Sequence, residues 1–107
     1  RAKVARAAGV RGFRFLHILG PCPPGWRYPT DQSVEVARLA VESRTFPLLE
    51  CDHGQWKVTF RPKHPVPVSE FLGAQGRFGH LSTAEIETIQ SHVDAHWDLL
   101  AALDSRA

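Results

Sequence analysis

The chain has 107 residues, a formal net charge of +2 and an apolar fraction of 43%. This length suits one small domain, or part of one, and leaves no room for a second core. The low net charge, with acidic and basic residues intermixed, argues against binding to nucleic acid or anionic lipid. No apolar run approaches the roughly 20 residues that span a bilayer, and no secretory signal pattern is present. We therefore expect a cytoplasmic protein that binds neither nucleic acid nor membrane.

The first part of the sequence predicts the element order of an α/β fold. Residues 2–8 are rich in helix formers and are followed by glycines, which predicts a short helix. Residues 13–19 are mostly aromatic and aliphatic and lie between glycines, which is typical of a buried strand. Thr30 and Asp31 offer N-caps for a helix over residues 32–42. The apolar face of that helix is predicted to contain Val34, Ala37 and Val41.

The second part predicts a β-hairpin and two helices. Two β-type runs, residues 46–50 and 56–60, are joined by a stretch that contains Asp52 and Gly54, residues typical of turns. Three prolines then interrupt regular structure, and residues 68–74 predict a short helix. A last, amphipathic helix is predicted from a Ser-x-x-Glu capping box at residues 82–85 to about residue 103.

Cys22 is the main functional candidate. It lies in the loop GPCPPGW, residues 20–26, in which three prolines fix backbone torsions and can hold one thiolate in place. In open α/β sheets, ligands bind just beyond the carboxyl ends of strands, where this loop would lie. A structural cysteine in a rigid turn is the alternative, because no CxxC partner accompanies Cys22. The residues alone leave both interpretations open.

Other side chains are weaker candidates. A zinc site is a weak hypothesis, because the spacing of the available ligands matches no known finger; these are Cys22, Cys51, His17, His53 and His64. His92 and His96 lie one turn apart on the predicted last helix, but two histidines without further ligands favour a solvent-exposed pair. Arg77, beside Phe78, is either an interface anchor or, with better support, an arginine that pins a loop.

Four segments resemble one protein family in the same order and spacing. They are residues 15–26 (FLHILGPCPPGW), 37–42 (ARLAVE), 46–50 (FPLLE) and 75–78 (QGRF). Over nearly its whole length the chain resembles the C-terminal third of the thiamine-diphosphate-binding β subunit of pyruvate:ferredoxin oxidoreductase and related 2-oxoacid:ferredoxin oxidoreductases. The resemblance implies an α/β fold in which residues 1–107 form a single segment, the C-terminal part of a thiamine-diphosphate-binding domain. The first residue is Arg1 rather than methionine, and we expect this segment to be incomplete on its own.

The resemblance also implies an enzymatic function for the assembled protein. Family members oxidatively decarboxylate a 2-oxoacid, such as pyruvate, on thiamine diphosphate held by magnesium. They transfer the acyl group to coenzyme A and pass electrons through iron-sulfur clusters to ferredoxin. The segment alone would be inactive and would act with the other subunits of the oxidoreductase.

Residue by residue, the resemblance assigns one ligand. Cys22 matches the last of four cysteines that bind a [4Fe–4S] cluster, whereas the other three, and the GDG…N segment for magnesium and diphosphate, are absent from this sequence. Cys51 stands where the family has an apolar residue, so we expect a packed thiol without a ligand role. The alternative function is a non-catalytic interaction module that keeps the family shape without the cofactor half. The sequence identifies neither the 2-oxoacid nor the electron acceptor.

Overall fold

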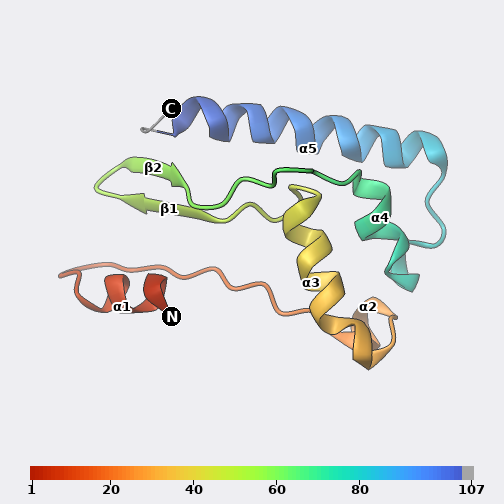
Figure 1. Ribbon diagram of the computed structural model, residues 1–107, viewed down its shortest axis with the longest axis horizontal. Helices are drawn as coiled ribbons and strands as arrows, with labels where there is room; N and C mark the ends of the chain where they lie inside the picture. Colours follow the sequence, from red (N-terminus) through yellow and green to blue (C-terminus); the bar gives the residue numbers. More distant parts are fainter. Residues whose placement is uncertain (105–107) are drawn as a thin grey trace.

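The computed structural model describes residues 1–104. Three helices, α3 (Ser33–Glu42), α4 (Val68–Gly73) and α5 (Thr83–Leu103), build most of the core, and α5 runs along one side of the molecule (Figure 1). The main buried cluster joins α3 and α4 to the loop after the Cys22 segment; its members are Tyr28, Val36, Ala40, Val68, Phe71 and Leu72. The structure combines helices with one small two-stranded sheet, in agreement with the broad α/β class.

The predicted hairpin is present. Strands β1 (Leu49–Asp52) and β2 (Gln55–Val58) pair antiparallel, with Leu49 opposite Val58. The two turn residues, His53 and Gly54, have φ values of 49° and 80°, as a tight two-residue hairpin turn requires. Regular pairing is shorter than predicted, because it starts at Leu49 rather than at residue 46.

The hairpin is fastened to the end of α5. Val58, Trp97 and Leu100 form a second buried cluster between β2 and α5. Asp104, directly after the helix, is 5% exposed and accepts hydrogen bonds from the Val58 amide (3.2 Å) and the Arg61 guanidinium (3.0 Å). A buried carboxylate needs such partners, and here they join the C-terminal end of α5 to the hairpin.

The predicted start of α5 is confirmed. The Ser82 hydroxyl accepts a hydrogen bond from the Glu85 amide (3.2 Å), and the Glu85 carboxylate accepts one from the Ser82 amide (2.7 Å). The Ser82 backbone bond, followed by the Ser82 side-chain bond, lowers the pKa of Glu85 below its ordinary value. The capping box therefore satisfies two of the free amides at the helix start.

The predicted short helices are also present. Helix α1 (Ala2–Ala8) lies beside the hairpin, where the Lys3 ammonium donates to the Leu49 carbonyl (2.8 Å) and Arg6 pairs with Glu50. Helix α4 ends one residue earlier than predicted, and its Val68 amide donates to the Gln90 side chain of α5 (2.8 Å). Among residues 1–104, no helix has both the length and the apolar character needed to cross a membrane.

The prediction of a buried strand over residues 13–19 is wrong. This stretch is extended but unpaired, and the side chains of Phe13, Phe15 and Ile18 are 91%, 75% and 76% exposed. A strand needs a neighbour to satisfy its backbone groups, and the only ladder within the described residues joins β1 to β2. An apolar pattern shows that a segment can form a strand, but it does not show whether a partner strand is present. Residues 1–104 contain no such partner for residues 13–19.

The predicted cap and apolar face of α3 are wrong as well. Residues Thr30–Gln32 form a 3₁₀ turn, η1, and α3 begins at Ser33 without a side-chain cap. Val36 and Ala40 are buried, whereas Val34 is 74% exposed. Two residues along a helix correspond to a rotation of about 200°, so Val34 lies nearly opposite Val36. The face of α3 that packs against α4 therefore carries Val36 and Ala40, which are four residues apart.

Candidate functional site

Cys22 lies at the start of a one-turn helix. Helix α2 (Pro23–Trp26) follows Cys22 directly, and the Cys22 carbonyl accepts a hydrogen bond from the Trp26 amide at 2.8 Å. Pro23 and Pro24 occupy the first turn, where a missing N–H costs nothing because those amides have no helical partner. The sequence predicts a rigid loop here, and the structure shows a helical turn within it, for which the two successive prolines are a signal. The Cys22 thiol is free and exposed.

The thiol packs closely over a glycine. A Cβ atom added to Gly25 would lie 3.2 Å from Cys22 Sγ, closer than most real Cβ contacts. Any larger residue at this position would press against the sulfur. The absence of a side chain at Gly25 therefore allows the Cys22 sulfur to lie against α2 while the thiol stays exposed to solvent.

The chain leaves α2 through a left-handed residue that contacts a distant segment. Arg27 has φ 59° and ψ 63°, and its carbonyl accepts a hydrogen bond from the Gly76 amide at 2.9 Å. A Cβ atom on Gly76 would lie 2.9 Å from both the Arg27 carbonyl oxygen and the Arg27 Cβ. Only glycine allows this approach between backbones. The GPCPPGW and QGRF segments, which are far apart in the sequence, therefore meet in space.

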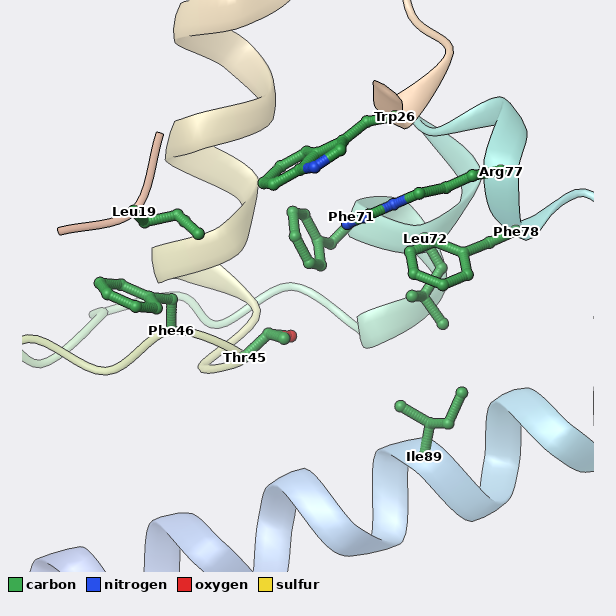
Figure 2. Close-up of a pocket in the computed structure, with 9 residues that line it drawn as sticks. All are labelled: Leu19, Trp26, Thr45, Phe46, Phe71, Leu72, Arg77, Phe78 and Ile89. Carbon is green, nitrogen blue, oxygen red and sulfur yellow. The ribbon is translucent and has the colours of Figure 1, made fainter. Parts of the chain in front are cut away.

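Arg77 strengthens this junction with a stacked contact. Its guanidinium carbon lies 4.3 Å from the centre of the Trp26 ring and 4.6 Å from that of Phe78, and Figure 2 shows the side chain between the two rings. Arg77 Nε also donates to the side-chain carbonyl oxygen of Gln75 at 2.9 Å. Gln75 is itself 1% exposed and donates to the Phe71 carbonyl at 2.8 Å. The interpretation of Arg77 as a residue that pins a loop is confirmed.

An open apolar hollow lies beside the stack. Its volume is about 360 Å³, and Figure 2 shows its lining, which consists of Leu19, Trp26, Thr45, Phe46, Phe71, Leu72, Arg77, Phe78 and Ile89. Small-molecule sites are mostly apolar but place a small number of available polar groups to orient the ligand. Here the lining offers only Thr45 and Arg77, and the guanidinium of Arg77 is already engaged with Trp26, Phe78 and Gln75. This hollow is therefore suited to packing rather than to a polar substrate.

The other candidates do not gather into a site. Cys51 is exposed near the tip of the hairpin, so the prediction of a packed thiol is wrong; α5 covers the hairpin at Val58, its other end. His53 pairs with its neighbour Asp52 at 2.6 Å in the exposed turn. His92 and His96 are exposed on α5, as predicted. In the part of the chain that the structure describes, no three His, Cys, Asp or Glu residues come together as metal ligands, so the zinc hypothesis gains no support.

The cysteines of this chain could supply one ligand of an iron-sulfur cluster but not a complete set. A [4Fe–4S] cluster takes four thiolates, and this chain has two cysteines in separate elements, Cys22 before α2 and Cys51 in β1. Cys22 has the properties of a contributed ligand, because its sulfur is free, exposed and attached to a short structured turn. The remaining ligands of such a cluster would have to come from another polypeptide segment.

Comparisons with known proteins agree with the resemblance in the sequence. The chain is 43% identical over 103 residues to the ketoisovalerate oxidoreductase subunit VorB of Pyrococcus furiosus, which covers 94% of this chain and 33% of the relative. It is 41% identical over 98 residues to the pyruvate synthase subunit PorB of Methanocaldococcus jannaschii, a match that covers 92% of this chain and 33% of the relative. It is 39% identical over 108 residues to the pyruvate synthase subunit PorB of Thermotoga maritima, a match that covers 96% of this chain and 33% of the relative. No family model matches the chain.

The match to these relatives covers one region of each of them. The chain spans about one third of the length of the curated relatives it matches, at about 40% identity over most of its own residues. The chain is a homologue of the β subunit of 2-oxoacid:ferredoxin oxidoreductases, and it corresponds to one third of that subunit.

Proposed function

We propose that this chain is the C-terminal part of the β subunit of a 2-oxoacid:ferredoxin oxidoreductase, where it completes the thiamine-diphosphate-binding domain and supplies Cys22 as one ligand of a [4Fe–4S] cluster. The identity to oxidoreductase subunits over more than nine-tenths of the chain supports the enzyme class. The observation that carries the ligand role is the free, exposed Cys22 thiol at the start of a helical turn whose other end contacts the QGRF segment.

The residues of this chain act by placing the sulfur. Two prolines and a backbone hydrogen bond restrict the turn after Cys22, so little conformational entropy remains to be lost when the thiolate binds iron. When bound, a [4Fe–4S] cluster supplies one-electron transfer, and its reduction potential depends on ligand geometry, hydrogen bonds and exposure. Thiamine diphosphate, magnesium, the other three cysteines and the coenzyme A site would belong to other segments or subunits.

The substrate is proposed only as a class. The names of the relatives include both pyruvate synthase and ketoisovalerate oxidoreductase, so a 2-oxoacid is the shared chemistry. We propose pyruvate as the first substrate to test and ferredoxin as the electron acceptor. The free, unpaired state of Cys22 and Cys51 is compatible with a reducing compartment, and we place the enzyme in the cytoplasm.

The test starts from the native polypeptide and its partners. Intact mass and sequencing upstream of Arg1 should reveal a chain, or a copurifying subunit, that carries the missing cysteines and the GDG…N segment. The assembled protein should then reduce ferredoxin in the presence of coenzyme A and either pyruvate or ketoisovalerate. An assembly that contains thiamine diphosphate and iron but oxidises neither 2-oxoacid would contradict this function.

The alternative is a non-catalytic interaction module of the same shape. One observation favours it: the chain contains two cysteines and, within residues 1–104, no cluster of metal ligands. If the copurifying partner lacks further cysteine ligands and the assembly contains no iron, the module is the better account. Iron at about four or more atoms per Cys22 site would favour the enzyme.

A further inference from the structure

We infer that Arg77 is a positioning residue for Cys22, and that it acts by holding the Trp26 ring and, through it, the one-turn helix that begins at the cysteine. The inference rests on the proposed role of Cys22 as a cluster ligand. It assigns to the QGRF segment a function in the redox properties of the site, although none of its residues is expected to touch the cluster.

The first step is that the prolines and the few backbone hydrogen bonds of α2 are not enough to keep this short helix in place without tertiary contacts. Isolated helices shorter than about 12 residues are marginal in water, and α2 has four residues, two of them prolines that donate no hydrogen bond. Its conformation therefore depends on contacts with other parts of the chain. A displacement of Trp26 is passed directly to Cys22, because the Trp26 amide bonds to the Cys22 carbonyl.

The second step is that the backbone hydrogen bond and the cation–ring contact that hold the end of α2 both come from one segment, Gly76–Phe78. Gly76 donates its amide to Arg27, and Arg77 stacks on Trp26. The Trp26 ring also makes edge contacts with Phe71 and Tyr28, with ring centres 6.4 Å apart in each case. Of these, Arg77 brings a charge–ring interaction and has a fixed orientation of its own, set by Gln75.

The third step is that the preceding side of Cys22 offers less restraint. Within residues 1–104, the backbone amides of residues 11–21 donate no hydrogen bond to another backbone group. The contacts there include Leu19 against the main core, His17 at the edge of Phe46 with ring centres 5.2 Å apart, and a hydrogen bond from the Arg14 guanidinium to the Ala8 carbonyl (3.3 Å). The position of the sulfur is therefore determined mainly by the residues on the C-terminal side of Cys22.

The stack depends on the planar guanidinium rather than on charge alone. Lysine keeps the charge but lacks the flat group that lies between two rings and donates to Gln75. Leucine removes both the charge and the hydrogen bond. The expected order of disturbance is Arg77→Leu first, then Arg77→Lys. A matched control is Arg38→Leu, since Arg38 is an exposed arginine on α3 whose one ion pair within residues 1–104 is with Glu35, one turn away.

The experiment uses the assembled enzyme and measures the cluster itself. Redox titration followed by electron paramagnetic resonance (EPR) gives the reduction potential, and loss of iron to a chelator gives the lability of the cluster. Arg77→Leu should shift the potential and lose iron about tenfold faster, as residues that orient a metal ligand typically influence binding by about 10- to 100-fold. Arg77→Lys should change both in the same direction but less, and Arg38→Leu should change neither.

The outcomes separate this inference from the function on which it rests. If Cys22→Ala leaves the EPR spectrum intact, the ligand assignment is wrong and the inference fails with it. If Cys22→Ala removes the signal while Arg77→Leu keeps the potential and the iron-release rate of the unmodified enzyme, only the inference is wrong. Should Arg77→Leu fail to assemble, Arg77→Lys and Phe78→Leu carry the same test, and unchanged values in both would overturn it.

Discussion

The two sides of Cys22 differ in how they are held. Residues 13–19, before it, are extended and carry apolar side chains that face outward, whereas residues 23–28, after it, pass through a helical turn into the buried core at Tyr28. Both stretches are rich in apolar residues, so hydrophobic content does not distinguish them. The difference lies in the partner: the second stretch meets η2 (Gly76–Phe78) and α4, and the first meets little within the described residues.

The largest expected effect on stability comes from comparing a phenylalanine in the packed region with one in the exposed stretch before Cys22. Phe71 is buried in α4 against the Trp26 ring, and Phe13 faces outward. Phe71→Ala should lower the free energy of unfolding by about 3–5 kcal/mol, because it removes a large apolar group and leaves a cavity. Phe13→Ala should stay within about 0.5 kcal/mol. Chemical denaturation of the isolated 107-residue chain measures both, and equal effects would contradict the described packing.

The next effect tests the backbone junction with a pair of glycines. Gly76→Ala places a methyl group 2.9 Å from the Arg27 carbonyl oxygen and should cost about 2–3 kcal/mol of stability through the forced separation of the two segments. Gly73→Ala is the control, because a Cβ atom there meets nothing within 4 Å. In the last turn of α4 it should be neutral or stabilising by up to about 1 kcal/mol. Thermal melting compares the two, and a neutral Gly76→Ala would disprove the tight approach.

The smallest effect concerns the capping box of α5, far from Cys22. Ser82→Ala should cost about 1 kcal/mol, because the Glu85 amide loses its acceptor. The pKa of Glu85 is lowered in the folded chain, so its contribution to stability is present above the ordinary value of 4.5 and is lost as the pH falls through the lowered pKa. Glu85→Gln should flatten the dependence of stability on pH below about 4.5. An unchanged pH profile in this variant would show that the carboxylate contributes nothing there.

Local signals explain the elements that were predicted correctly. The Ser82 and Glu85 pair, the two-residue turn at His53 and Gly54, and the proline before α4 each act through bonds or torsions within a few residues. Such signals can be read from a single sequence. They placed α1, the hairpin, α4 and α5 close to their observed positions.

Most of the errors concern contacts between distant segments, whereas the missed 3₁₀ turn before α3 and the missed helical turn after Cys22 are local. Whether residues 13–19 pair as a strand depends on a neighbour, and which face of α3 is buried depends on α4. The exposure of Cys51 depends on how far α5 covers the hairpin. The junction between Arg27 and Gly76 was missed for the same reason, although the resemblance had already singled out both segments.

The central claim is that Cys22, and not Cys51, is a cluster ligand. The most direct measurement is the EPR spectrum of the reduced, assembled enzyme, compared between Cys22→Ala and Cys51→Ala. Both thiols are free and exposed, so the pair controls for the general loss of a reactive cysteine. We predict that Cys22→Ala abolishes or shifts the signal of one [4Fe–4S] cluster and that Cys51→Ala leaves every signal unchanged. A Cys22→Ala spectrum identical to that of the unmodified enzyme would contradict the account.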